Sequence, residues 1–451
     1  MNDNFDGGTA THNLRGNSSA EVSNSGQPDE TLGPERRKKI FAGSLGNMVE
    51  LLDWCIYATF SSVFAHQFFP SGSQTSALLA TLAIFAVSFV MRPVGAAVIG
   101  VYADKFGRKN SLVLTVGLMS VTTLIIGVAP TYAQIGAFAP LLLLTARLIQ
   151  GFAAGGEFGS ASAYLVESAT PTRRGLAGSW QQVSVAAGLL LASGMGAVLT
   201  TALPKDSLES WGWRVGFIAS SVLGLVALWL RRSVEENKSF ETGKARTKNK
   251  KKSSLVVMLR DHPRAFFRVF ALNIPGIILY NVFITFLPTY AHIAKGLPLG
   301  SALTANAIAI AVFMVCLPLV GSLSDRIGRR PTMLMFATGM VAFSWPALHL
   351  LNDNFWVYLG IQVTAVILLV GYSANLATIM AEQFPPEVRV TGIGLPYSLC
   401  LALFGGTVPY LMTRMYSNGL SDWLWVYCTA AAIFGVFIYA RMPETRGIKM
   451  D

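Results

Sequence analysis

The chain has 451 residues, of which 52% are hydrophobic and 13% are charged, and its mean hydropathy is +0.49. A water-soluble domain does not have enough core positions to bury this many apolar side chains. The composition therefore excludes a soluble globular protein and indicates a membrane protein. The formal net charge of +11 does not indicate a nucleic-acid-binding protein, because the basic residues are scattered between apolar runs instead of lining one face.

Residues 1–39 are rich in Asn, Ser, Gly and Thr and contain no apolar run that could serve as a cleavable signal peptide. We expect this segment to be a disordered cytoplasmic tail. The four cysteines lie inside later apolar runs without paired spacing, so the sequence predicts neither a disulfide framework nor a zinc site.

Apolar runs of about 20 residues, the length that crosses a bilayer, then follow in two groups of six. The first group lies in residues 40–230, with spans at 41–65, 76–101, 110–129, 136–164, 175–201 and 212–230. The second lies in residues 266–441, with spans at 266–291, 303–323, 332–351, 355–380, 391–413 and 422–440. A basic, polar linker, 231–265, separates the groups, and residues 442–451 form a second cytoplasmic tail. The sequence therefore predicts an all-α membrane protein with twelve transmembrane helices in two six-helix halves.

The distribution of Lys and Arg predicts the orientation of these spans. With the N-terminus inside, most basic residues fall in cytoplasmic segments, and those in the opposite loops are Lys205, Arg214, Lys295 and Arg414. We therefore expect a multi-pass protein of the inner or plasma membrane with both termini in the cytoplasm. The basic linker would be a topology signal and tether, or alternatively a site for anionic lipid or a regulatory partner.

Two loops in the two halves share a sequence pattern. Residues 100–109 (GVYADKFGRK) follow the second span, and residues 321–330 (GSLSDRIGRR) follow the eighth. A second duplicated pair follows each loop, with Glu167 and Arg174 in the first half and Glu382 and Arg389 in the second. Because the duplicated loops lie on one predicted side, the halves should be parallel repeats related by an axis along the membrane normal.

This pattern resembles the signature loop of the major facilitator superfamily, over residues 36–445. Gly107 and Gly328 can supply the positive φ of a tight turn, while Asp104 and Asp325 can pair with a guanidinium group or a helix N-terminus. The resemblance implies a cytoplasmic gate that closes in the outward-open state; the alternative is a plain turn that only sets topology. The residues expected in this gate are Gly100, Asp104, Gly107, Arg108, Glu167, Arg174, Asp325, Gly328, Arg329, Glu382 and Arg389.

Charged residues also lie inside the predicted spans of the first half: Glu50, Asp53, Arg92, Arg147 and Glu157. A charge at the centre of a span costs about 2.5 to 3.5 kcal/mol, so each should face a cavity or a partner. The helix rise puts Asp53 and Arg147 near the midplane, and Glu50 shares a helix face with Asp53. One acid could hold Arg147 while the other exchanges a proton, or the pair could be a structural salt bridge.

The other intramembrane polar groups each have two interpretations. Glu157 could be an inner proton acceptor or the partner of a cytoplasmic-side Arg. Arg92 could hold a substrate carboxylate in bidentate geometry, as could Arg147, or Arg92 could pair with Glu50 or Glu157. Polar residues of the second half could orient a solute or instead bond neighbouring helices. They are Tyr280, Asn281, Gln362, Asn375 and Tyr397.

Longer motifs point to one branch of the superfamily. They are residues 46–54 (GNMVELLDW), 92–95 (RPVG), 147–157 (RLIQGFAAGGE) and 211–214 (WGWR). Together they resemble the metabolite:proton symporters, and segments at loops and span ends most resemble the 2-oxoglutarate and dicarboxylate permeases.

The resemblance implies proton-driven import of a small organic acid such as 2-oxoglutarate, with the proton as coupling ion and no cofactor. Alternatives are a symporter of shikimate or aromatic acids, one of proline or betaine, and a drug efflux antiporter. We expect no enzyme, because no nucleophile, metal site or acid–base pair stands at an accessible interface. The expected partners are the organic acid, protons and the lipid bilayer, with no nucleic acid, and the chain should be a monomer.

Overall fold

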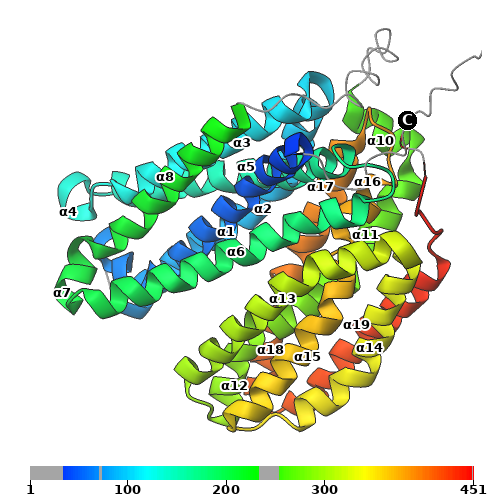
Figure 1. Cartoon of the computed structure of the whole chain (residues 1–451). Helices are drawn as coiled ribbons and strands as arrows, with labels where there is room; N and C mark the ends of the chain where they lie inside the picture. Colours follow the sequence, from blue (N-terminus) through cyan, green and yellow to red (C-terminus); the bar gives the residue numbers. More distant parts are fainter. Residues whose placement is uncertain (1–33, 71–73, 233–252, 449, 451) are drawn as a thin grey trace, which may run out of the picture.

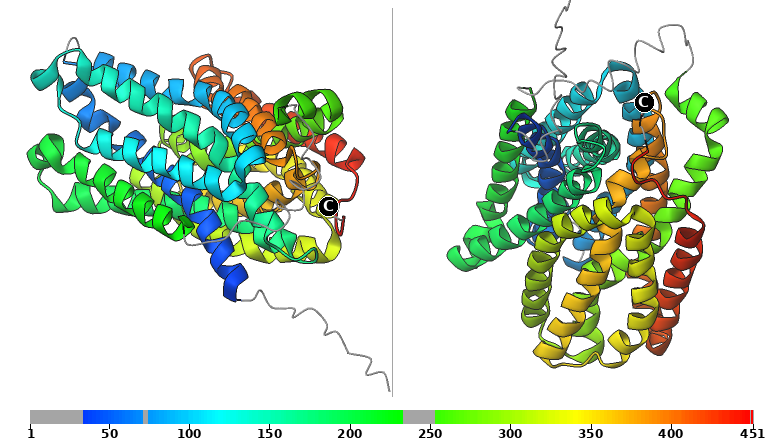
Figure 2. Two further views of the ribbon diagram at one scale, coloured as in Figure 1. Left: turned by 90° about the horizontal axis from the view of Figure 1, so that it is seen from above. Right: turned by 45° about the vertical axis from the view of Figure 1, so that its right-hand side comes forward.

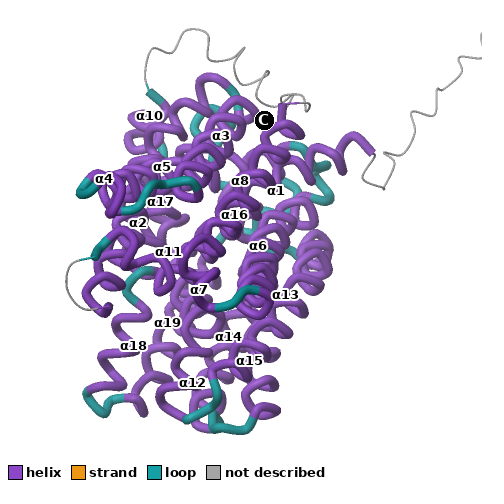
Figure 3. The backbone as a smooth tube through the Cα atoms, turned by 90° about the vertical axis from the view of Figure 1, so that its left-hand side faces the viewer, coloured by secondary structure: helices purple, strands orange, loops and turns teal. Residues whose placement is uncertain are grey.

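The computed structural model describes residues 34–70, 74–232, 253–448 and 450. Throughout these residues the backbone forms helices joined by short loops, without a strand (Figure 3). Most of the predicted N-terminal tail and residues 233–252 of the predicted linker lie outside the described residues.

The first half contains six long helices that overlap the six predicted spans. They are α1 (Pro34–Phe68), α2 (Gln74–Phe106), α3 (Arg108–Gly127), α5 (Phe138–Glu167), α6 (Arg174–Ala202) and α8 (Trp213–Arg232). Three short elements lie in the connections at one end: α4 (Tyr132–Ile135), α7 (Lys205–Ser207) and the π-helical turn η1 (Leu208–Gly212).

The second half follows α10 (Ser254–Asp261) and also has six spans. Three are single helices: α13 (Leu299–Ile327), α14 (Arg329–His349) and α19 (Leu424–Arg441), the last preceded by η4 (Ser421–Trp423). Three are composite: α11 (Pro263–Tyr280) with η2 (Asn281–Phe286) and α12 (Leu287–Lys295); α15 (Phe355–Ser373) with α16 (Leu376–Ala381); and α17 (Arg389–Cys400) with η3 (Leu401–Gly405) and α18 (Val408–Ser417).

The prediction of an all-α membrane protein with twelve spans is confirmed. Within the described residues, ten helical segments are long and apolar enough to cross a membrane, and α1 and the composite span that begins with α17 complete the set. The hydropathy pattern did not reveal the π-helical turns η2 and η3 that interrupt the seventh and eleventh spans. Prolines lie near both turns and deprive the backbone of an N–H donor: Pro275, Pro288 and Pro396.

The two halves are separate bundles that meet at one end. In the first half α1 packs on α6, α2 on α5 and α3 on α8; in the second α13 packs on α15 and α14 on α19. The halves meet where α6 contacts α13 and where α2 contacts α17. Figure 1 shows them diverging from the end near α10 and α16 toward the ends that carry α7 and α12, and the right-hand view of Figure 2 also separates the two bundles.

Helices α2 and α5 touch backbone to backbone because glycines line their contact. A Cβ on Gly151 would lie 2.1 Å from the carbonyl oxygen of Ser88, and one on Gly155 would lie 2.0 Å from that of Arg92. Side chains larger than hydrogen would force the helices apart. This close approach brings the charged side chains of α2 and α5 near those of α1.

We expect Gly151→Ala to lower the melting temperature of the detergent-purified protein, because its methyl group would overlap the Ser88 carbonyl and overpacking costs about 1 to 3 kcal/mol. The matched control is Gly360→Ala in α15, where an added Cβ would meet nothing within 4 Å. The control should retain or raise the melting temperature, because alanine has the higher helix propensity. Tryptophan fluorescence during heating measures these melting temperatures. Equal values for Gly151→Ala and the unsubstituted protein would contradict the close contact.

Candidate functional site

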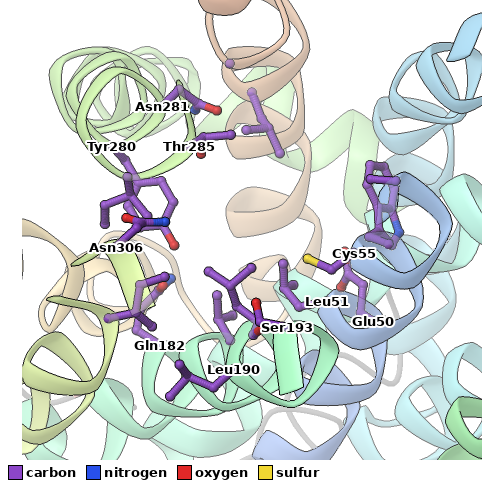
Figure 4. Close-up of a pocket in the computed structure, with 18 of the residues that line it drawn as sticks. Glu50, Leu51, Cys55, Gln182, Leu190, Ser193, Tyr280, Asn281, Thr285 and Asn306 are labelled. Carbon is purple, nitrogen blue, oxygen red and sulfur yellow. The ribbon is translucent and has the colours of Figure 1, made fainter. Parts of the chain in front are cut away.

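A cavity of about 1390 Å³ lies between the two halves. Its walls come from α1, α2, α5 and α6 of the first half and from α11, η2, α12, α13, α15, α16, α17 and η3 of the second. Its inner end contains Phe158 and Tyr397, whose stacked rings have centroids 3.8 Å apart. From there it extends toward Thr200 and Thr304, away from the end where the halves meet. Figure 4 shows Glu50, Gln182 and Ser193 of the first half around the same space as residues of the second.

Among the described lining residues, Glu50 and Arg92 carry the charges, one negative and one positive. They form an ion pair in which Arg92 Nη2 donates a hydrogen bond to Glu50 Oε1. The Arg92 guanidinium also lies 4.4 Å from the ring centroid of Trp54 and 5.6 Å from that of Phe89. Aromatic faces stabilise a cation, so the pair and the rings together hold a charge that would otherwise be costly at this depth.

The opposite wall is neutral and polar. Tyr280, Asn281 and Asn306 line it, and Figure 4 shows their side chains around the cavity. Gln362 does not line the cavity but donates from its Nε2 to Asn306 Oδ1 over 2.6 Å and so orients that amide. This wall therefore offers hydrogen bonds but no charge to a solute.

The expected substrate-binding residues divide into two groups. Arg92, Tyr280, Asn281 and Tyr397 line the cavity, whereas Arg147, Gln362 and Asn375 do not. Asn375 instead donates to Thr332 Oγ1 over 3.0 Å and to the Gly371 carbonyl over 2.8 Å, inside the second half.

Asp53 and Arg147 form the pair that their depths predict, but it is sealed from the cavity. Arg147 Nη1 lies 2.9 Å from Asp53 Oδ2, and the guanidinium carbon lies 3.7 Å from the Tyr57 ring centroid. Thr123 Oγ1 donates to Asp53 Oδ1 over 2.8 Å and accepts from Gln150 Nε2 over 2.8 Å. This network joins α1, α3 and α5 in the interior of the first half.

Glu157 pairs with Arg231, near the end of α8. This matches the interpretation of Glu157 as the partner of a cytoplasmic-side Arg. Arg231 Nη2 is 2.7 Å from Glu157 Oε1, and Thr115 Oγ1 donates to Glu157 Oε2. The carboxylate is fully buried and does not line the cavity. The pair ties α5 to α8.

The duplicated aspartates each cap a helix of the other half. Asp104 accepts from the backbone N–H groups of Val390 and Thr391, both over 3.1 Å, at the start of α17. Asp325 accepts from Gly175 N over 2.8 Å and from Leu176 N over 2.9 Å, at the start of α6. A carboxylate at a helix N-terminus satisfies free N–H groups and interacts favourably with the helix dipole. These two caps close the cavity at this end.

The backbone at the two duplicated loops fits the predicted turns. Gly107 has φ 108° and Gly328 has φ 107°, a region that L-residues with side chains rarely adopt. A Cβ on Gly100 would lie 2.9 Å from Thr391 Cα, and one on Gly175 would lie 2.4 Å from the Gly321 carbonyl oxygen. The two halves therefore approach each other backbone to backbone where the gate is expected.

Other residues expected in the gate form ion pairs at this end. Glu167 binds Arg108 of its own half over 3.1 Å and Arg389 of the other half over 2.6 Å. Its counterpart Glu382 binds Arg329 of its own half over 3.4 Å. Burial raises the pKa of Glu382, and Arg329, Thr445 and Arg174 of the other half offset this effect only in part.

Some site residues were missed by the sequence reasoning. Glu444 accepts from Arg329 N over 2.9 Å and from Arg330 N over 3.0 Å, so it caps α14 next to the gate. Ile448 was also missed: its carbonyl accepts from the expected gate residue Arg174 over 2.6 Å, which ties the segment after α19 to the first half. Asn306 is a polar residue inside an apolar run, and that signal could have identified it.

Comparisons with known proteins agree on the family. The model of the Major Facilitator Superfamily matches residues 43–409. The alpha-ketoglutarate permease of Escherichia coli (strain K12) is 37% identical over 418 residues, covering 92% of this chain and 95% of that protein. The citrate-proton symporter of Klebsiella pneumoniae is 32% identical over 409 residues, covering 90% of each. A structure of the proton:xylose symporter XylE bound to 6-bromo-6-deoxy-D-glucose has a TM-score of 0.78 at 18% identity, covering 92% of this chain and 98% of that one.

We expect Asp53→Asn to lower the free energy of unfolding by about 3 to 5 kcal/mol, because it leaves the Arg147 charge buried without its carboxylate. The double variant Asp53→Asn with Arg147→Met should recover much of this loss, since no charge then remains at the site. Thermal unfolding in detergent measures both. A double variant that is less stable than Asp53→Asn alone would contradict the assignment of this pair as the source of the loss.

We expect Asp325→Asn to open the gate, because the amide lacks the charge that strengthens the bonds to Gly175 and Leu176. Bonds to a charged group contribute about 1.5 to 3 kcal/mol, so the open population should rise at least about tenfold. Double electron–electron resonance between spin labels at Asn110→Cys and Arg330→Cys, with the native cysteines replaced, measures the separation.

The matched control is Glu209→Gln, which removes the exposed 3.8 Å pair with Lys205. Surface pairs contribute little, so the distance distribution should not change. An unchanged distribution in Asp325→Asn as well would rule out the carboxylate as the closing element.

Proposed function

The chain belongs to the major facilitator superfamily, and on this premise we propose that it imports a small organic acid together with protons by alternating access. The family makes it a multi-span membrane transporter and not an enzyme. The coupling to protons, the direction of transport and the solute are the parts that we propose.

The observation that carries the proposal is the guanidinium of Arg92 inside the cavity between the halves. A guanidinium can bind a carboxylate through two parallel N–H bonds, which suits an organic acid better than a sugar or a cation. The named activities of the two relatives, an alpha-ketoglutarate permease and a citrate-proton symporter, are consistent with a di- or tricarboxylate. We therefore propose 2-oxoglutarate or a related dicarboxylate as the solute.

The rest of the acid would lie against the neutral wall. Tyr280, Asn281 and Tyr397 line that side, and Asn306, oriented by Gln362, adds a further amide. Arg147 and Asn375 would act indirectly, through the packing of helices around the cavity. The ionisable groups available for proton coupling are Glu50, Asp53 and Glu157, with Arg147 as the partner of Asp53.

Alternating access would proceed by release of the gate. The Asp104 and Asp325 caps and the Glu167 bridge to Arg389 hold the halves together at the end with the duplicated loops. By the positive-inside rule that end is cytoplasmic, so we assign the present state as outward-facing, in the cell membrane, with both termini inside. Rocking of the halves would break these contacts and expose the cavity to the cytoplasm. A monomer is sufficient for this cycle, because each half supplies one wall.

One observation favours a second solute class. Aromatic side chains line much of the cavity, and a ring-bearing acid such as shikimate could stack on them. They are Trp54, Phe89, Phe158, Tyr280, Tyr372 and Tyr397. A zwitterion such as proline or betaine also carries one carboxylate and remains a further alternative.

We expect cells that express the chain to accumulate labelled 2-oxoglutarate, and a protonophore to abolish the accumulation because it removes the driving gradient. Excess succinate should compete, whereas betaine should not. Cells with Glu209→Gln, which alters an exposed pair far from the gate, should accumulate as much as cells with the unsubstituted chain. Competition by shikimate alone would reassign the solute, and accumulation that survives the protonophore would contradict symport.

A further inference from the structure

The three acid–arginine pairs formed by Glu50, Asp53 and Glu157 differ in their access to the cavity. Asp53–Arg147 and Glu157–Arg231 do not line it, and each carboxylate has a further donor in Thr123 or Thr115. Only Glu50–Arg92, among the described lining residues, brings charge to the cavity surface. A solute entering the cavity therefore meets one ion pair.

The Arg92 guanidinium lies beside two aromatic rings and donates to Glu50 from its edge. Its central carbon is 4.4 Å from the ring centroid of Trp54 and 5.6 Å from that of Phe89, and these rings stabilise the cation. A carboxylate binds the edge, where the N–H groups point. In the described structure Nη2 donates to Glu50, while the buried Nε has no hydrogen-bond partner. The edge that a substrate carboxylate needs is therefore partly occupied by Glu50.

Arg92 is the cation that pairs with Glu50, because the other charged groups near Glu50 are acids or belong to other pairs. Asp53 on its own helix and Glu157 on α5 are like charges, and each has its own arginine, Arg147 and Arg231. Tyr397 of α17 interacts electrostatically with both members of the pair. An incoming anion would add a further negative charge beside Glu50. Two carboxylates beside one guanidinium repel each other, so protonation of one of them favours binding.

We propose that Glu50 and the carboxylate of the transported acid bind Arg92 in turn, and that a proton taken up by Glu50 releases Arg92 to the substrate. The inference rests on the proposed function, and it identifies the coupling site within it. The proton moves from water in the cavity to a carboxylate oxygen of Glu50, and Arg92 keeps its charge throughout. After the acid leaves on the other side, Glu50 loses the proton there and restores the pair. One proton is therefore carried for each carboxylate bound at Arg92.

This exchange gives the other two pairs a different role. Asp53–Arg147 joins α1, α3 and α5, and Glu157–Arg231 joins α5 and α8, so both hold the half rigid as it moves. Neither has to break for a solute to bind. Glu50 is thus the acid whose protonation and substrate binding are linked.

The test is equilibrium binding to purified protein from pH 5.5 to 8, with 2-oxoglutarate, citrate, shikimate and betaine as probes. Affinity for the acid that binds should fall about tenfold per pH unit once Glu50 is ionised, because binding then requires proton uptake. Calorimetry in two buffers of different ionisation enthalpy should give one proton taken up per acid bound. Affinity that stays constant over this range, or no proton uptake, would overturn the exchange even if variants fail to fold.

Glu50→Gln is the direct variant, since the amide keeps the shape but cannot compete as an anion. It should bind the same acid with an affinity that does not change with pH and with no proton uptake. In proteoliposomes it should exchange labelled for unlabelled acid but lose accumulation driven by a proton gradient. Arg92→Lys keeps the positive charge but cannot donate two parallel N–H bonds to a carboxylate, so it should lower the affinity at least about tenfold.

Two outcomes separate the inference from the proposed function. If the unsubstituted protein binds none of the four probes, the proposed function fails and the inference fails with it. If it accumulates an acid with protons while Glu50→Gln does so equally well and folded Asp53→Asn does not, symport stands and the exchange at Glu50 is overturned.

Discussion

A charge buried in a membrane-spanning bundle requires a partner on another helix, and this requirement organises the first half of the protein. Each of its intramembrane acids is bound by an arginine from a different helix: Glu50 by α2, Asp53 by α5 and Glu157 by α8. An unpaired charge costs several kcal/mol, so the three pairs fix which helices are neighbours. The glycines between α2 and α5 let these two helices, each of which supplies an arginine to an acid of α1, pack backbone to backbone.

The second half contributes uncharged side chains to the cavity, in contrast to the charged pair of the first half. Among the described residues, its cavity wall combines amides, phenols and hydroxyls with apolar side chains, and π-helical turns interrupt two of its spans beside the cavity, at Asn281 and Leu401. A π-helical turn loosens the regular hydrogen-bond ladder and often marks a functional position. Among the described lining residues, the first half therefore supplies the charges of the cavity and the second half supplies uncharged groups. The gate joins them by reciprocal helix caps, in which each half supplies the carboxylate that the other half's helix needs.

The sequence predicted the spans, the duplication and the identity of the buried charges, because hydropathy and motif spacing are local properties. It could not assign every pairing. Glu50 and Asp53 are three residues apart, and the sequence left open which of them holds Arg147 and whether Arg92 pairs with Glu50. Residues at this spacing differ by about 60° around a helix, enough to face different neighbours. Glu50 faces Arg92 and Asp53 faces Arg147. Gln362 and Asn375 show the same limit, since only tertiary contacts distinguish a polar group that lines a cavity from one that bonds a neighbouring helix.

The matched charges of Glu50 and Arg92 have an electrical consequence. With Glu50 ionised, the charges on the described lining residues sum to zero, so the empty cavity carries no net charge as the halves rock. The membrane potential would then neither drive nor oppose the return of the unloaded carrier. A monoanion carried with one proton would also cross without net charge, whereas a dianion with one proton would move one negative charge. Against an inside-negative potential that step costs about 2.3 kcal/mol per 100 mV, so the ionisation state of the solute decides whether uptake is electroneutral or electrogenic.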